Sequence, residues 1–262
     1  MGRPFYPDHG TEREKLGIMR RDSQTKDRKK PNLGRRIAAS LMRFWLTLRY
    51  RWLSRRYGKL VVEEIHGLPL VILPDVFNPV LLRSGEQLAR FIDSYDISRE
   101  STVLDLGTGS GVGAIFAARR SAFVTAVDLN PSAVRCARIN TILNDLEERI
   151  TLLHGDLFEP VQGCQFDLIL FNPPFYIGKP ADELDRAWRG EEIFERFASE
   201  LHSALAPGGC ALLILSTDGE GEALLALLHA EGFNISIAEK VDLINEVMTI
   251  YEVTSSKKRT DV

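Results

Sequence analysis

Cysteine is scarce in this sequence, with three residues among 262. Cys136, Cys164 and Cys210 are too scattered to form a zinc-binding set, and their odd number does not suit a disulfide framework. The five histidines are equally dispersed. The sequence therefore predicts neither a bound metal nor a disulfide-stabilised extracellular fold, and it favours a reducing compartment.

Long apolar runs are also missing. No stretch approaches the roughly 18–20 apolar residues that span a bilayer, and the first thirty residues lack the apolar centre of a signal peptide. Tyr6 stands where a myristoylation signal has Ser or Thr. We therefore expect a cytoplasmic protein, and the 44% hydrophobic and 26% charged residues are typical of an ordinary globular one.

Charge is plentiful but unevenly distributed. Residues 1–60 contain 17 basic and 5 acidic residues, whereas the remaining 202 contain 16 and 31, so the net charge of −3 conceals parts of +12 and −15. A segment this basic points to an anionic partner, either RNA or a membrane surface. The alternative is that its apolar side packs on the acidic remainder of the same chain.

Composition divides the chain into four segments. Residues 1–32 are polar and poor in branched apolar residues, which predicts a disordered basic tail. Over 33–58 apolar residues recur at helical spacing among arginines, which predicts a cationic amphipathic helix. Over 59–100 we expect a hairpin around Gly67 and a helix leading into the core. Residues 101–262 form the main domain.

Within the main domain, short apolar runs alternate with helical stretches. Strands are expected at 102–106, 123–128, 150–154, 166–171, 209–216, 233–240 and 246–254. Helices are expected at 111–120, 131–143, 189–205 and 219–231, after an earlier one at 84–93. This alternation predicts an α/β fold with a seven-stranded, mostly parallel, doubly wound sheet and a basic helical N-terminal extension.

A glycine-rich turn follows the first strand of the main domain. It has the form Asp-x-Gly-x-Gly-x-Gly, with Asp105 followed by Gly107, Gly109 and Gly111. A dinucleotide-binding turn counted from the first of these glycines requires another at 112, where this chain has Val112. Glycines let the backbone turn tightly and let a ligand approach closely. In open α/β sheets the ligand crevice lies at this edge, outside the carboxyl ends of the strands.

Carboxylates also follow the next two strands. Asp128 ends the second strand, where a carboxylate can accept hydrogen bonds from both hydroxyls of a ribose. Asp156 lies just past the third strand, where it can accept an adenine amino group, with Leu129 and Leu157 covering the ring faces. Asn130 is expected to cap the helix that follows Asp128.

The fourth strand ends at Asn172-Pro173-Pro174-Phe175. Two prolines fix two φ angles and remove two backbone donors, so the loop is stiff and presents acceptors. The Asn172 side-chain oxygen and the Pro173 carbonyl can each accept one N–H of a planar –NH₂ group. Such a loop aligns a nitrogen through orientation and fixed dipoles, without a strong base. Phe175 offers a flat apolar surface to the group that carries the nitrogen.

Together, the glycine turn and Asn-Pro-Pro-Phe resemble motifs I and IV of the class I S-adenosylmethionine-dependent methyltransferases. The resemblance implies a Rossmann-like fold with the methyltransferase domain over 101–262, S-adenosyl-L-methionine as cofactor and methyl transfer to an amide or amino nitrogen. Asp105 is then expected near the cofactor's ammonium group, directly or through water. The implied cofactor-binding residues are Asp105, Gly107, Thr108, Gly109, Gly111, Asp128, Leu129, Asp156, Leu157 and Asn172, and the implied catalytic residues are Asn172, Pro173, Pro174 and Phe175.

Flanking residues are similar to the release-factor glutamine methyltransferase family. Trp188-Arg189-Gly190 follows the Asn-Pro-Pro-Phe motif, and Val76-Phe77-Asn78-Pro79 precedes the domain as a Val-aromatic-x-Pro segment. This chain departs from the family at 81–86, where an acidic-Thr element is usual, and it lacks the usual helical substrate domain. The resemblance implies a protein glutamine as methyl acceptor.

Three alternatives stay open at this point. The Asn-Pro-Pro-aromatic motif is shared with enzymes that methylate guanine N2 or adenine N6 in RNA, and a small-molecule acceptor is also compatible. A protein of a different class, a non-catalytic binding or membrane-anchored protein on the same fold, is the distant alternative. The joint presence of Asp105, Asp128 and Asn172 argues against it, because a site without chemistry does not need all three.

Overall fold

The computed structural model describes residues 59–120, 123–173, 193–217, 219, 221–243 and 246–256. All of them belong to one compact unit. The tail predicted at 1–32 and the cationic helix predicted at 33–58 lie outside the described residues, so both remain predictions. In the described part of the chain, no helix combines the length and the apolar content that crossing a membrane requires.

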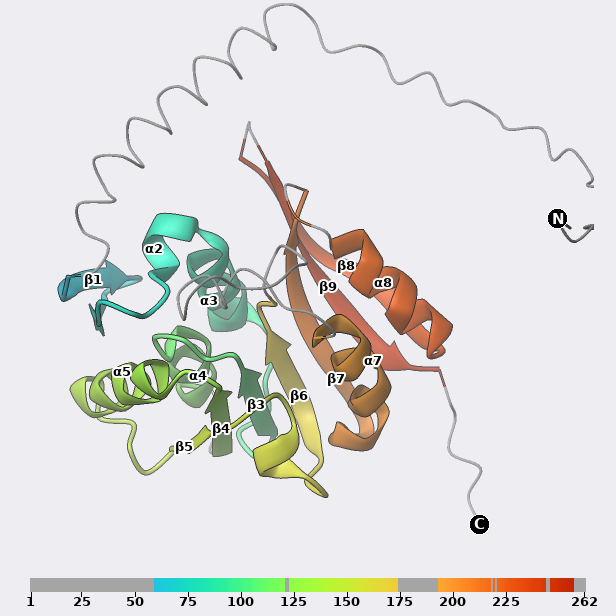
Figure 1. The fold of residues 1–262 in the computed structure, drawn as a ribbon, viewed down its shortest axis with the longest axis horizontal. Coiled ribbons are helices and arrows are strands. Elements are labelled where there is room, and N and C mark those ends of the chain that lie inside the picture. The colour runs from blue at the N-terminus through green and yellow to red at the C-terminus, as the bar shows by residue number, and fades with distance from the viewer. Residues whose placement is uncertain are drawn as a thin grey trace, which may run out of the picture. The chain divides into compact units, whose positions relative to one another are not determined.

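A seven-stranded sheet with strand order β5-β4-β3-β6-β7-β9-β8 forms the centre of the fold (Figure 1). Its strands are β3 Thr102–Leu106, β4 Phe123–Asp128, β5 Ile150–His154, β6 Phe166–Phe171, β7 Leu205–Ser216, β8 Phe233–Asp242 and β9 Val247–Ser255. The first five strands in this order pair in parallel, and β9 runs antiparallel to both of its neighbours. The predicted seven-stranded, mostly parallel sheet is therefore confirmed.

Helices cover both faces of the sheet (Figure 1). On one face lie α3 Ser84–Ser94, α4 Val112–Ala118 and α5 Pro131–Leu143, and on the other lie α7 Ile193–Ala204, α8 Gly221–Ala230 and the 3₁₀ turn η1 Glu159–Val161. Along β3, Val103 belongs to the apolar cluster of the first face and Leu104 to that of the second. Strands buried on both sides in this way are mainly apolar, which is why β3 was visible in the sequence.

Most bounds lie within two residues of the sequence-based ones, and two differences are larger. β7 begins at Leu205 instead of 209, because Leu205 pairs with Phe166 of β6 as soon as α7 ends. The short helix α2 Pro79–Leu82 was not predicted. Its start carries ordinary signals, since the Asn78 side chain accepts hydrogen bonds from two backbone N–H groups and Pro79 occupies the first turn. Four residues are too few to show helical periodicity.

A β-hairpin precedes these elements in the chain. Its strands, β1 Val61–Ile65 and β2 Leu68–Ile72, pair antiparallel around His66 and Gly67, whose φ angles are 47° and 78°. Positive φ at both central residues is the geometry of a two-residue turn that matches the twist of the strands. The hairpin and helix expected within 59–100 thus correspond to β1, β2 and α3.

A polar stripe on α5 connects the hairpin to the glycine turn. Buried Asn140 accepts a hydrogen bond from the Val71 N–H at 2.6 Å and donates to the carbonyls of Val71 and Ser110, both at 2.8 Å. Cys136, one turn earlier on the same helix, donates to the Val71 carbonyl, and Asn144, directly after the helix, donates to the Pro69 carbonyl. One helix therefore positions both the hairpin and the loop that precedes α4.

Candidate functional site

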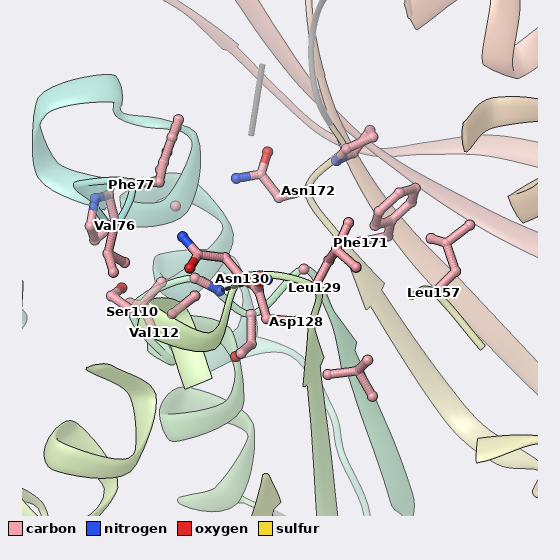
Figure 2. Close-up of a pocket in the computed structure, with 18 of the residues that line it drawn as sticks. Val76, Phe77, Ser110, Val112, Asp128, Leu129, Asn130, Leu157, Phe171 and Asn172 are labelled. Carbon is pink, nitrogen blue, oxygen red and sulfur yellow. Dashed lines mark hydrogen bonds between the residues drawn. The ribbon is translucent and has the colours of Figure 1, made fainter. Parts of the chain in front are cut away.

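A cavity lies at the carboxyl ends of β3, β4, β5 and β6 (Figure 2). The described site residues predicted from sequence that line it are Gly107, Thr108, Gly109, Asp128, Leu129, Asp156, Leu157, Asn172 and Pro173. Asp105 and Gly111 are not part of the lining, and Pro174 and Phe175 lie outside the described residues. The fold thus brings the ends of four strands, far apart in sequence, to one space.

The glycine turn is held against the end of β4. Its glycines at 107, 109 and 111 have φ angles of 65°, 56° and 85°, all in the left-handed region that other residues avoid. The Gly109 N–H donates to the Asp128 carboxylate at 2.8 Å. At Gly111 a Cβ atom would come within 3.0 Å of the Cβ of Ala137 on α5. Gly111 is therefore required for packing of the turn, although it does not line the cavity.

The carboxylate of Asp105 faces the inside of the protein. Its Oδ2 accepts hydrogen bonds from the Thr108 hydroxyl at 2.6 Å and the Ala114 N–H at 2.9 Å. A Cβ at Gly113 would lie 2.8 Å from its Oδ1, so only glycine leaves room for it. Burial raises the pKa of Asp105 to about 6, although the two hydrogen bonds oppose the shift. In this arrangement Asp105 joins the turn to α4, and its predicted contact with a cofactor ammonium stays a prediction.

Asp128 occupies the centre of the cavity floor. Its two oxygens each accept one backbone hydrogen bond, from Gly109 and from Asn130, both at 2.8 Å. A carboxylate offers about four acceptor positions, so two remain for a ligand. Burial raises the pKa of Asp128, and the two backbone hydrogen bonds and nearby His154 work against that shift. The arrangement suits a pair of neighbouring hydroxyl donors.

One wall of the cavity comes from the end of β5. The Asp156 Oδ2 accepts a hydrogen bond at 2.6 Å from Arg196 of α7, which fixes the carboxylate, and no side chain in the described part of the chain bonds to its other oxygen. Leu157 next to it has a φ of 46°, unusual for a residue with a branched side chain. Such strain is tolerated where the surrounding structure requires it, often at binding sites. The leucine side chain is thereby placed in the lining.

Asn172 projects from the end of β6 at the rim of the cavity (Figure 2). Its Nδ2 donates a hydrogen bond to the Ser84 hydroxyl at 3.1 Å. Its Oδ1 is buried and has no hydrogen-bond partner among the residues that the structure describes. The hydroxyl of Ser110, also in the lining, is in the same condition. Buried polar atoms without partners are rare, and in a cavity they mark places where a ligand donor fits.

Another wall of the cavity comes from the segment between the end of β2 and the start of α2, whose residues were not among the predicted site residues. Val76, Phe77 and Pro79 belong to the lining, and their segment is fixed at both ends. At one end the Asn78 amide donates to Glu63 of the hairpin at 3.0 Å, and at the other the Asn130 amide donates to the Asp75 carbonyl at 2.9 Å. Hydrogen bonds to the hairpin and to the end of β4 therefore hold this wall in place.

Other lining residues were missed for a simple reason. Ser110, Asn130 and Ile193 contribute to the cavity, but the site prediction included none of them. Asn130 was visible as a helix cap and Ser110 lies between two glycines, so both had a local signal. Ile193 had none, because the start of α7 reaches this cavity only through the packing of that helix on the sheet.

Comparison with known proteins supplies the family. The sequence profile of the methyltransferase small domain matches residues 69–231. A putative protein N5-glutamine methyltransferase of Methanocaldococcus jannaschii is 33% identical over 202 residues, which are 72% of this chain and 98% of that protein. The ribosomal RNA small subunit methyltransferase C of Alcanivorax borkumensis is 32% identical over 158 residues, which are 60% of this chain and 45% of that protein. This chain thus spans nearly all of one relative and less than half of the other.

A solved structure shows the same fold. The tRNA m1G37 methyltransferase of M. jannaschii superimposes with a TM-score of 0.55 at 20% identity, over 76% of this chain and 55% of that one. At this level of identity the likeness concerns the architecture of the sheet and its helices.

Proposed function

Because this chain belongs to the methyltransferase small domain family and is an S-adenosylmethionine-dependent methyltransferase, we propose that it methylates the side-chain amide nitrogen of a protein glutamine. The observation that carries the proposal is the Asn172 side chain, whose Oδ1 is buried at the cavity rim and has no partner among the described residues. An acceptor in this place receives an N–H donor, and a primary amide offers two.

The lining fits S-adenosyl-L-methionine. Three carboxylates, Asp75, Asp128 and Asp156, belong to it, and no Lys or Arg does among the described lining residues. Among the cofactor's groups, the sulfonium and ammonium are cations and the two ribose hydroxyls and the adenine amino group are donors, so these groups suit acceptors, whereas its carboxylate requires donors. We assign the hydroxyls to Asp128 and the amino group to Asp156, with Leu129 and Leu157 against the ring. When bound, the cofactor supplies a methyl group on a sulfur that leaves with the bonding electron pair.

The chain itself orients the acceptor nitrogen. The Asn172 Oδ1 and the Pro173 carbonyl each take one N–H, so the nitrogen lone pair points to neither of them and is free to meet the methyl group. Holding the nitrogen in this position removes the entropy cost of bringing nitrogen and methyl group together in the reactive geometry. Most of the rate acceleration is expected from this effect. The carbonyl and amide dipoles favour the increase of positive charge on the nitrogen during transfer, and the methylated nitrogen then loses one proton to water. Pro174 and Phe175 complete this loop in the proposal.

Charge favours a protein over RNA as acceptor. Residues 61–262 carry a formal charge of −15, and the cavity lining is acidic. RNA binding depends on Lys and Arg that neutralise phosphates, and an acidic surround opposes it. The relative that this chain spans almost completely is named for a protein glutamine.

An RNA amino group is the second candidate. It is favoured by the relative named for ribosomal RNA and by the +12 charge of residues 1–60, which would supply the phosphate contacts. In that case the basic segment docks the RNA and the same Asn172 acceptor orients an exocyclic –NH₂.

The test uses methyl-tritiated S-adenosylmethionine with purified release factor, total RNA and a small-molecule extract as separate acceptors. We expect label in the release factor on a glutamine, located by mass spectrometry. Asn172→Ala should lower transfer by about 100-fold or more, a larger effect than its effect on cofactor binding, which calorimetry measures. Asp128→Ala should lose cofactor binding. Label in RNA that disappears with Asn172→Ala would replace the glutamine proposal with the RNA one.

A further inference from the structure

Asn172 is held by a residue that lies 88 positions earlier in the chain. Its Nδ2 donates to the hydroxyl of Ser84 at 3.1 Å. Ser84 is the first residue of α3 and is completely buried. It does not line the cavity, so its hydroxyl is available to the asparagine but not to a ligand.

The side-chain amide of asparagine has two different ends. Oδ1 accepts hydrogen bonds, whereas Nδ2 only donates them, and a half-turn of the amide exchanges the two. An –NH₂ of the methyl acceptor needs the Asn172 oxygen at the cavity rim. In the exchanged orientation the Asn172 –NH₂ group would face the –NH₂ of the acceptor, and the two donors could not bond. In the structure the Ser84 hydroxyl accepts from the nitrogen, which lies on the far side, and the oxygen has no partner among the described residues.

The connection between α2 and α3, which contains Ser84, has a constrained backbone. Arg83 joins α2 to α3 with a φ of 62° and a ψ of −30°, a conformation that non-glycine residues rarely adopt. At Gly85 a Cβ would lie 2.5 Å from the Cβ of Pro79, so the first turn of α3 packs directly on α2. Unusual backbone geometry of this kind persists only where the surrounding contacts require it. The constrained connection between α2 and α3 therefore holds the Ser84 hydroxyl in one position.

We propose that Ser84 is a positioning residue for methyl transfer: its hydroxyl accepts the Asn172 amide hydrogen and so keeps Oδ1 directed to the acceptor nitrogen. The inference rests on the proposed function, because it takes Asn172 as the residue that receives the acceptor. It adds a contribution from α3, an element outside both sequence motifs.

The first experiment detects the hydrogen bond itself, in the full-length protein. The side-chain amide signals of Asn172 are identified in ¹⁵N-correlated spectra by their absence in Asn172→Ala. Ser84→Ala should shift these signals and speed their exchange with water. Ser94→Ala is the matched control, because Ser94 lies on the same helix and its hydroxyl bonds to Phe91 at the exposed end. It should leave the signals unchanged.

The second experiment measures transfer to release factor. Ser84→Ala should lower kcat by about 10- to 100-fold through misorientation, with the Kd of the cofactor unchanged. Ser84→Thr keeps the hydroxyl and should restore most of the loss. Adding Ser84→Ala to Asn172→Ala should cause no further decrease, because a residue that acts through Asn172 has nothing left to position.

The outcomes separate the two proposals. Unchanged Asn172 signals in Ser84→Ala overturn the positioning role, whichever acceptor the enzyme uses. A further decrease of kcat in the double variant overturns it as well, because Ser84 then acts independently of Asn172. If the signals shift but wild-type protein does not label the release factor, the Ser84–Asn172 pair stands and the glutamine assignment fails.

Discussion

Asp105 illustrates how one buried side chain can support a loop and still destabilise the fold as a charge. Two hydrogen bonds favour its ionised form, but burial has the larger effect and raises its pKa to about 6 from an ordinary value of 3.8. Folded protein therefore binds the proton more tightly than unfolded protein does. The contribution of this group to stability is greatest below about pH 4 and is lost as the pH rises through 6.

We predict a pH-dependent effect of Asp105→Asn, which cannot titrate. The free energy of unfolding of the wild type minus that of the variant should decrease by up to about 3 kcal/mol between pH 4 and pH 7, because two pKa units correspond to about 2.7 kcal/mol. Urea unfolding at several pH values measures this difference. A constant difference across the range would show that Asp105 does not titrate with a raised pKa.

At the scale of elements, α5 connects two segments that the sequence separates. Asn140 makes three hydrogen bonds to the backbone of β2 and the glycine turn, all from a position with no exposure to solvent. The carbonyl of Ser110, one of its partners, belongs to a residue of the cavity lining. Asn140 therefore supports the glycine turn on the side that faces away from the cavity.

Asn140→Ala should lower the free energy of unfolding by about 2–4 kcal/mol, because it leaves buried backbone groups unpaired. We also expect weaker cofactor binding, since the glycine turn loses a fixed point. Thermal unfolding and calorimetry measure the two effects. Asn144→Ala is the matched control one turn later, where the side chain meets the Pro69 carbonyl near the surface. Similar losses in both variants would argue against a special role of Asn140.

At the scale of the whole molecule, the separation of charge predicts a salt-dependent interaction. The full chain should bind an RNA fragment or anionic vesicles at about 50 mM salt and lose much of this affinity by about 200 mM. A chain that begins at Lys59 should bind neither, and it should retain cofactor affinity because the described residues that line the cavity all follow that position. Co-sedimentation and filter binding distinguish vesicles from RNA. Equal binding by both chains would place the anion-binding surface on the acidic part.

Local patterns determined much of this architecture. The strands at 102–106, 123–128, 150–154 and 166–171 were predicted with the bounds that the structure shows, because each is a short, mainly apolar run between helical stretches. The same logic brought Asp128, Asp156 and Asn172 to one cavity, since parallel strands end at one edge of their sheet.

The tertiary structure decided what each side chain faces. The carboxylate of Asp105 lies beneath the turn, bonded to Thr108 and Ala114, and its expected proximity to the cofactor, directly or through water, stays a prediction. The bonds from Asn172 to Ser84 and from Asn140 to Val71 span 88 and 69 positions. Periodicity reports only which neighbours along the chain share a face, whereas hydrogen-bond partners this distant are set by how the elements pack. The sequence by itself therefore determined the sheet and the edge that carries the site, and packing determined which of its polar atoms remain free to meet a ligand.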